Sequence, residues 1–156
     1  MCILSLAGAG IIRWPDGVPD MNCHEMKVEV GFRHCDPAGI VFYPRYAEMV
    51  NDTVEHWFGH GLGVGFDGLH RVRGIAIPMV RLDFHFMAPS RLGETLRCVL
   101  RVKETGRSSV ALVVDLVGQE GSARVRAAGT FVFVDMQSMK PSEMPSDLRR
   151  SIEAYR

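Results

Sequence analysis

One carboxylate, Asp36, stands in the segment HCDPAGIVFYPRY (residues 34–46) among residues suited to burial and tight turns. Pro37 restricts the backbone beside it and Gly39 permits a sharp turn, so the acid can be presented on a rigid loop ahead of a helix. Such a carboxylate can attack a carbonyl carbon as a nucleophile, or take a proton from water as a general base. Both roles stay open, and an aspartate before a proline is also common in turns without chemistry.

A reaction at a carbonyl also needs a hydrogen-bond donor for the charge that develops on the carbonyl oxygen. The residues from Pro44 onward predict a helix, and the free N–H groups at a helix N-terminus supply such donors together with the positive end of the helix dipole. We therefore predict that the backbone amide of Tyr43, immediately before Pro44, is this donor.

Cys35 and His34 adjoin Asp36, and a cysteine–histidine pair is an alternative nucleophile. Neighbouring residues of an extended strand point to opposite faces, so Cys35 and Asp36 are not expected to share one site. We expect Cys35 to be a small packing residue instead.

Periodic apolar residues predict the elements that position this segment. Residues 26–32 alternate, which predicts a half-buried strand with Phe32 on its inner face. From Pro44 the apolar residues are spaced by three and four, which predicts an amphipathic helix of about four turns that ends at Gly59 or Gly61. We expect the glycine-rich residues 59–70 to be a flexible connection. The predicted apolar face of the helix consists of Tyr46, Met49, Val50, Val54, Trp57 and Phe58.

The second half of the chain predicts strands joined by short turns. Residues 79–86 and 95–105 alternate, whereas 109–118 are almost continuously apolar and 127–135 end in a β-rich run, so the last two are predicted to be the more central strands. The turns ETGRS and GQEGS suit hairpins. The inner face of the first of these strands is predicted to hold Val80, Leu82, Phe84 and Phe86.

A last amphipathic segment, residues 146–155, predicts a short helix with Ser146 as its cap. The elements then follow in the order strand, helix, four strands, short helix. One helix laid on an antiparallel sheet of about five strands is the economical way to bury these faces, and this predicts an α+β fold.

Composition restricts the class of protein. The 156 residues include 18 basic and 18 acidic side chains, so the overall charge suits neither a nucleic-acid partner nor an anionic membrane surface. The four cysteines contain no CxxC pair, which argues against a disulfide framework or a zinc ribbon and favours reduced thiols in a cytoplasmic protein. The histidines have no spacing that fixes a metal site.

The first residues differ from the rest of the chain. An apolar run, MCILSLAGAGII, precedes the turn-like RWPDGVPD and a methionine at position 21, without the basic region of a secretory signal. We expect residues 1–22 to be a disordered or loosely packed extension and residues 23–156 to form a single domain.

The string DPAGIVFYPRY after a short strand, the helix, and the segment RGIAIPMVRLDFHFMAPSRLGETL together resemble the 4-hydroxybenzoyl-CoA thioesterase family of hotdog-fold acyl-CoA thioesterases. The resemblance covers roughly residues 28–135. It implies a five-stranded antiparallel sheet wrapped around a long central helix, and hydrolysis of acyl-CoA thioesters without metal or cofactor. It also implies homo-oligomers, as dimers that share active sites or as tetramers made of two such dimers.

The resemblance implies roles for further residues. Asp36 and Tyr43 would be catalytic, and Lys103 and Arg107 would lie near the coenzyme A phosphates, although the family carries more basic residues there. Asn51 stands where the member acting on the hydroxylated ring has an acid, which argues against a 4-hydroxybenzoyl preference. The substrate-binding residues expected besides these are Gly39, Tyr46 and Val50.

Two other functions fit the same fold. A hotdog hydratase or dehydratase would act on related thioesters but is expected to pair a histidine with an acid, a pattern that does not accompany Asp36. A non-catalytic acyl-CoA-binding protein would keep the fold without turnover. We favour hydrolysis of esters with aryl or short to medium acyl groups.

Overall fold

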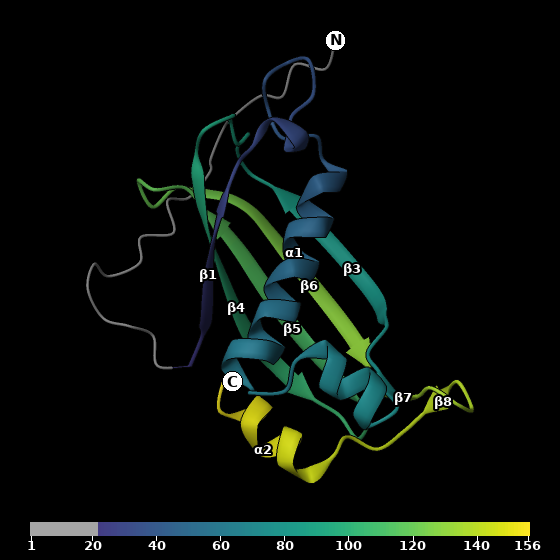
Figure 1. Cartoon of the computed structure of the whole chain (residues 1–156). Coiled ribbons are helices and arrows are strands. Elements are labelled where there is room, and N and C mark those ends of the chain that lie inside the picture. Colours follow the sequence, from purple (N-terminus) through teal and green to yellow (C-terminus); the bar gives the residue numbers. More distant parts are fainter. Residues whose placement is uncertain (1–21) are drawn as a thin grey trace.

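The computed structural model describes residues 22–156. An antiparallel five-stranded sheet in the order β1-β4-β5-β6-β3 curves around helix α1, and the short helix α2 lies beside one end of the sheet (Figure 1). The predicted α+β arrangement is confirmed. The expectation for residues 1–21 lies outside the described residues. The elements named here are β1 (His24–Glu29), α1 (Pro44–His56), β3 (Met79–Phe86), β4 (Thr95–Thr105), β5 (Ser109–Val117), β6 (Ala123–Val132) and α2 (Ser146–Glu153).

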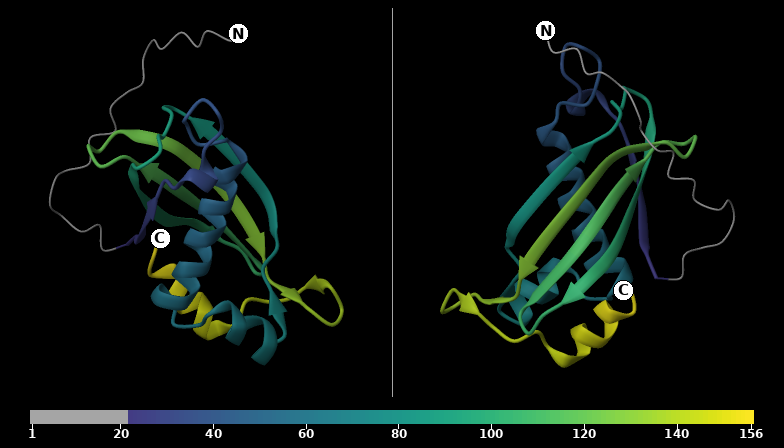
Figure 2. Two further views of the ribbon diagram at one scale, coloured as in Figure 1. Left: turned by 45° about the horizontal axis from the view of Figure 1, so that its top comes forward. Right: turned by 180° about the vertical axis from the view of Figure 1, so that it is seen from behind.

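The sheet is built mainly from two hairpins. β4 pairs with β5, and β5 pairs with β6, through the two predicted turns. β5 is therefore the central strand, while β1 and β3 form the edges by pairing with β4 and β6. The views in Figure 2 show α1 on one face of this sheet, and within residues 22–156 no helix covers the opposite face.

The core lies between α1 and the sheet. All six apolar residues predicted for the inner face of the helix are 0–5% exposed, because spacing by three and four places them on one stripe. Alternation does the same for β4, where the side chains that point to the helix are fully buried. These are Leu96, Cys98, Leu100 and Val102.

The main helix is shorter than the long central helix that the family resemblance implies. α1 has 13 residues and continues into five residues of π-helix, η2 (Trp57–Gly61). The prediction of a flexible connection over residues 59–70 was wrong in part, since it contains the end of η2 and the start of a second π-helical turn, η3 (Gly68–Val72). Leu69 on η3 is fully buried, and this anchors the connection to the core.

For two strands, the prediction of which side chains point inward was wrong at the strand ends. β1 stops at Glu29, and Phe32 is 85% exposed in the 3-10 turn η1 (Phe32–His34). Val80 is 61% exposed, because the pairing of β3 with β6 shifts at this residue and the bulge turns its side chain outward. Phe86, at the other end of this edge strand, is 51% exposed.

The end of the chain differs in two details. Ser146 is not the cap of α2, because Pro145 occupies that position and no side-chain hydrogen bond caps the helix. A small sheet was also not predicted, since its strands have only two residues each and carry no periodic signal. Its strands are β2 (Ile75–Ala76), β7 (Val134–Asp135) and β8 (Lys140–Pro141), in the order β2-β7-β8.

Candidate active site

Asp36 lies at the start of a tight turn in the connection between η1 and α1. This connection is the loop that leads into α1 at the top of Figure 1. Its N–H donates to the carbonyl of Ile40 (3.0 Å), and the N–H of Gly39 donates back to the carbonyl of Asp36 (2.9 Å). Gly39 has a φ of +73°, a backbone conformation that favours glycine. The turn therefore needs Gly39 for its shape, as the sequence predicted.

The carboxylate of Asp36 is oriented by this same turn. Its Oδ1 accepts a hydrogen bond from the N–H of Ala38 (2.8 Å), while no hydrogen bond or ion pair within residues 22–156 engages Oδ2. Asp36 is half-buried and lines a depression with Arg33, Phe42 and Arg45. One carboxylate oxygen is thus fixed while the other remains available, in a depression whose other charged groups are two guanidinium groups.

The amide of Tyr43 lies at the N-terminus of α1. Tyr43 occupies the cap position, Pro44 is the first helical residue, and no side chain caps the helix. Among the hydrogen bonds of residues 22–156, none uses the N–H of Tyr43. Phe42 and Arg45, which flank this amide in the chain, line the same depression as Asp36. A free donor at the positive end of a helix dipole therefore lies between two residues that line the Asp36 depression.

Cys35 and His34 do not form a pair. The thiol of Cys35 lies 3.8 Å from the carbonyl of Gly31, and the N–H of Gly31 donates to Nδ1 of His34 (3.0 Å). Burial lowers the pKa of His34, and Arg33 beside it lowers the pKa further. His34 is therefore held neutral by η1, and no contact in the described residues joins it to the thiol.

Tyr46 and Val50, on the inner face of α1, are almost fully buried in the protomer, at 3% and 1% exposure. The hydroxyl of Tyr46 donates to Oγ of Ser90 (3.0 Å) and accepts from the N–H of Ser90 (3.3 Å). The carbonyl of Ser90 in turn accepts from the N–H of Val41 (2.9 Å), at the end of the Asp36 turn. Tyr46 thus supports the turn, and substrate contact by Tyr46 or Val50 stays a prediction.

Asn51 lies at a different cavity from Asp36. This cavity, of about 310 Å³, is bounded by α1, η3, the start of β3 and the small sheet. None of the residues that line it also lines the Asp36 depression. His70 and Asn51 are its polar side chains. The apolar lining consists of Val54, Phe66, Ala76, Ile77, Pro78, Met79, Phe131 and Met139.

Lys103 and Arg107 lie near the far end of β4, in and beside its hairpin with β5. The carbonyl of Arg107 accepts from Arg149 of α2 (3.1 Å), and its exposed guanidinium lies 3.6 Å from Glu143. β4 has 11 residues, so roughly 35 Å separate this hairpin from the strand's first residue, which adjoins the Asp36 end. A single chain therefore does not bring Arg107 and Asp36 together.

His24 and His56 are in contact, which the sequence did not predict. Nε2 of His24 lies 2.7 Å from Nδ1 of His56, and His60 stacks on His56 with ring centroids 4.1 Å apart. Burial, together with the nearby His56 and His60, lowers the pKa of His24 to about 4. No group of three or more His, Cys, Asp or Glu in residues 22–156 is arranged to hold a metal ion.

Several residues near the candidate sites carried no clear signal in the sequence. Arg33 and Arg45 line the Asp36 depression, but a single charged residue in a turn or first helical turn usually marks only a solvated face. His70 lines the second cavity from within the glycine-rich segment, where no periodicity was available. Within the part of the chain that the structure describes, no helix is long and apolar enough to cross a membrane.

Residues 30–152 match the family described as the thioesterase-like superfamily. A comparison with curated protein sequences finds no significant match.

Solved structures share the fold. A thioesterase superfamily protein from Jannaschia sp. CCS1 aligns with a TM-score of 0.79 and 26% identity over 86% of this chain and 93% of that chain. A 1,4-dihydroxy-2-naphthoyl-CoA thioesterase from Synechocystis aligns with a TM-score of 0.77 and 19% identity over 83% and 95%. A gentisyl-coenzyme A thioesterase aligns with a TM-score of 0.73 and 23% identity over 81% and 99%.

These comparisons confirm the expectation of a thioesterase at the level of the superfamily. The narrower resemblance to the 4-hydroxybenzoyl-CoA family is not what the family comparison matches, and it stays a prediction. Since the match covers residues 30–152 of 156, the chain belongs to the thioesterase-like superfamily.

Proposed function

We propose that the protein hydrolyses acyl-CoA thioesters to the free acid and coenzyme A, with Asp36 as the nucleophile or general base. The observation that supports this most directly is the pairing of two available groups at one end of α1. Oδ2 of Asp36 and the N–H of Tyr43 are both without a hydrogen-bond partner in the described residues, on neighbouring turns of the chain. Polar groups left available in this way are common where a protein binds or transforms a ligand.

The chemistry can follow either of two balanced routes. In the first, a carboxylate oxygen of Asp36 attacks the thioester carbonyl, the C–S bond breaks to release the thiolate, and water then cleaves the mixed anhydride. In the second, Asp36 takes a proton from water while that water attacks the carbonyl, and the C–S bond then breaks to release the coenzyme A thiolate, which takes up the proton from Asp36 or from solvent. In both routes the N–H of Tyr43 donates to the oxygen that becomes negatively charged.

The acyl group is proposed to be aryl or of short to medium length. The cavity beside Asn51 is separate from the Asp36 depression but lies further along the same helix, α1, and we propose that the acyl group extends towards it from a carbonyl held at Asp36. The cavity is mainly apolar and is lined by the rings of Phe66 and Phe131, which suits a compact apolar group. Asn51 and His70 add two polar groups at its wall, which can recognise a polar substituent. The dihydroxynaphthoyl and gentisyl thioesterases that share the fold are named for aryl substrates.

We propose that two protomers form each active site. Arg107 lies roughly a strand length from Asp36 in one protomer, whereas a two-fold pairing of antiparallel edges would bring the hairpin end of one chain towards the Asp36 end of the other. Within residues 22–156, no further strand of the sheet pairs with the outer edges of β1 and β3, so these edges can pair with another chain. A dimer, or a tetramer made of two dimers, would place Lys103 and Arg107 near the coenzyme A phosphates.

The test is a thiol-release assay with a panel of aryl, short, medium and long acyl-CoA esters. We expect turnover of aryl or shorter esters, and a faster reaction with a palmitoyl ester would overturn the acyl preference. If no ester releases thiol but coenzyme A esters still bind, the protein is an acyl-CoA-binding protein and not an enzyme. Hydration of enoyl esters without thiol release would instead indicate a hydratase.

A further inference from the structure

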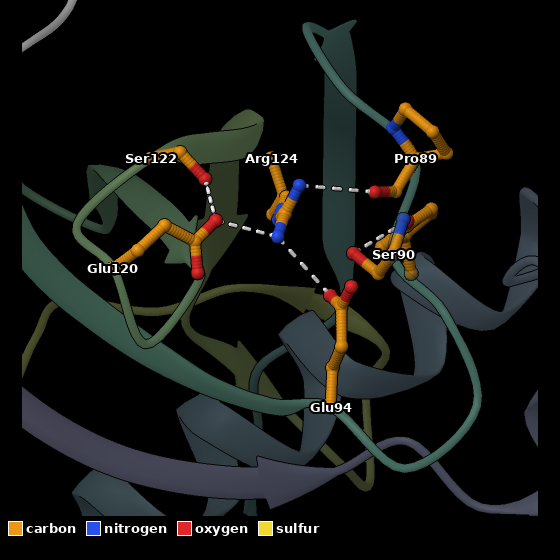
Figure 3. Close-up of polar contacts among 7 residues, drawn as sticks. Pro89, Ser90, Glu94, Glu120, Ser122 and Arg124 are labelled. Atoms are coloured by element: carbon orange, nitrogen blue, oxygen red, sulfur yellow. Dashed lines mark hydrogen bonds and ion pairs between the residues drawn. The ribbon is translucent and has the colours of Figure 1, made fainter.

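Arg124 on β6 joins separate segments of the chain through one guanidinium group (Figure 3). Nη1 donates to the carbonyl of Pro89 (3.3 Å), Nη2 donates to Oε1 of Glu120 (2.6 Å), and Nη2 forms an ion pair with Oε2 of Glu94 (3.3 Å). The side chain of Arg124 is 15% exposed, so water screens these contacts less than it would at an open surface. Ser122 donates a further hydrogen bond to Glu120.

These contacts hold residues 87–94, the connection between β3 and β4, from both ends. At the first end, the N–H groups of Met87 and Ala88 donate to the backbone carbonyl of Arg124 (2.9 and 3.2 Å). At the other end, the ion pair fixes Glu94, whose carbonyl accepts from Val30 (2.8 Å). Backbone hydrogen bonds also hold this connection, among them one from the N–H of Gly93 to the carbonyl of Val30 (2.9 Å), and the Arg124 side chain adds its contacts with Pro89 and Glu94 to them.

The same connection carries the Asp36 turn. The carbonyl of Ser90 accepts from the N–H of Val41, and Arg91 forms an isolated β-bridge with Ile40. The carbonyl of Ile40 accepts from the N–H of Asp36. Ser90 itself is fully buried, so a shift of the connection must move the turn as well.

We propose that Arg124 is a positioning residue for the reaction at Asp36. It acts through the connection 87–94 and Ser90, and it fixes both the Asp36 turn and, through Tyr46, the start of α1. Displacement of a reacting group by about 1 Å can cost up to a hundredfold in rate. Because Arg124 acts on Asp36 through other residues, its loss is expected to affect turnover more than substrate binding. This inference rests on the proposed function.

Arg126 provides a matched control. It lies two residues further along β6 and also forms an ion pair, donating to both oxygens of Asp115 on β5 (2.6 and 3.1 Å). No hydrogen bond or ion pair of Arg126 in the described residues reaches the connection 87–94. Lysine keeps the charge but loses the planar fork of arginine, so Arg124→Lys and Arg126→Lys remove the same chemistry from two different networks.

The first experiment measures amide hydrogen exchange, which requires no substrate. Arg124→Lys is expected to raise the exchange rates of the Asp36 and Val41 amides about tenfold, because the connection that holds the turn opens more often. Arg126→Lys is expected to leave both rates within about twofold of wild type. If Arg124→Lys does not fold, Glu94→Gln, which removes only the negative charge of the ion pair, is expected to give the same result. Unchanged exchange at Val41 in the folded variant would overturn the proposal.

The second experiment measures kcat and KM with the best ester of the panel, at a temperature where each variant is folded. Arg124→Lys is expected to lower kcat about tenfold with KM within about twofold, and Arg126→Lys to retain both. In an Asp36→Asn background, Arg124→Lys should cause no further loss. A retained kcat in Arg124→Lys, or the same loss in both backgrounds, would refute a positioning role. Wild-type protein that releases no thiol would refute the proposed function, while the exchange experiment still decides whether Arg124 holds the turn.

Discussion

The two ends of helix α1 differ in how deeply their side chains are buried. At the open end, around residues 36–46, Phe42 and Tyr43 are 45% and 66% exposed, and the Tyr43 amide and one oxygen of Asp36 are available to a ligand. At the closed end, around residues 56–61, Trp57 and Phe58 are fully buried. We infer that the open end leaves polar groups accessible to a ligand, whereas the closed end contributes to stability through the burial of its large side chains.

At the closed end, side chains from segments far apart in the sequence pack against α1 and η2. The ring of Tyr155 packs edge to face against Trp57, and its hydroxyl donates to the carbonyl of Gly61 (3.2 Å). His24 of β1 faces His56 at the end of α1. Changes at this end should therefore alter stability, and changes at the open end should alter turnover.

The largest expected effect is at Asp36. Asp36→Asn keeps the size of the side chain and the oxygen that accepts from Ala38, but it removes the charge and the basicity. If the carboxylate is nucleophile or base, kcat should fall at least about a hundredfold in the thiol-release assay while substrate binding is retained. If Asp36→Asn is active and Cys35→Ser is inactive, the nucleophile is the thiol of Cys35 and not the carboxylate of Asp36. The available oxygen of Asp36 would then have no role in turnover.

The next largest effect is expected from the Tyr43 amide itself. Tyr43 has a φ of −51°, which a proline ring can adopt, so Tyr43→Pro removes the N–H while keeping the turn of the backbone. Loss of an oxyanion donor typically costs a hundredfold or more in kcat, and we expect about that loss. Tyr43→Ala, which keeps the amide, is the control. Equal kinetics for the proline and alanine variants would exclude the amide as the donor.

At the closed end, Gly61→Ala should reduce stability. A Cβ atom on Gly61 would lie 2.6 Å from Cδ1 of Trp57 and 2.9 Å from the hydroxyl of Tyr155, so the packed rings must move. We expect the free energy of unfolding in urea to fall by about 1–3 kcal/mol, the usual range for overpacking. Gly59→Ala is the matched control, because a Cβ there meets no atom within 4 Å. Equal stability of both variants would show that this end is not tightly packed.

Acid should weaken the closed end through His24. Its folded-state pKa of about 4 lies below the ordinary value of 6.5, so its neutral form contributes full stability above pH 6.5. That contribution is lost as the pH falls from 6.5 to 4, because the unfolded chain takes up the proton first. We expect a loss of roughly 2 kcal/mol, which is less than the full shift implies because part of the ring meets solvent.

Urea unfolding at pH 7.5 and pH 4.5 measures this loss. The variant His24→Asn removes the titrating ring, so its stability should change less between the two pH values than that of wild type. His70→Asn is a control at a histidine that lies outside the pair. An identical pH dependence in wild type and His24→Asn would exclude the histidine pair as the cause.

The sequence predicted best what depends on local spacing. The inner face of α1, the paired strands β4 and β5 and the Asp36 turn follow from periodicity, proline and glycine within a few residues. It could not predict contacts between distant segments, such as Arg124 with Glu94 or His24 with His56, because nothing local to one partner identifies the other. Phe32 was misplaced for a related reason, since alternation continues past the point where pairing with β4 ends.

The smallest expected effect concerns the side chain of Tyr43. Its hydroxyl makes no hydrogen bond in the described residues, and its ring packs edge to face against Phe42 with centroids 5.2 Å apart, a contact that phenylalanine keeps. Tyr43→Phe should therefore retain kcat and KM within about twofold in the thiol-release assay, whereas Tyr43→Pro removes the amide and should not. A tenfold loss in Tyr43→Phe would mean that the phenol, and not the backbone, contacts the reacting group. The open end would then depend on an exposed side chain, and the helix N-terminus would lose its proposed role.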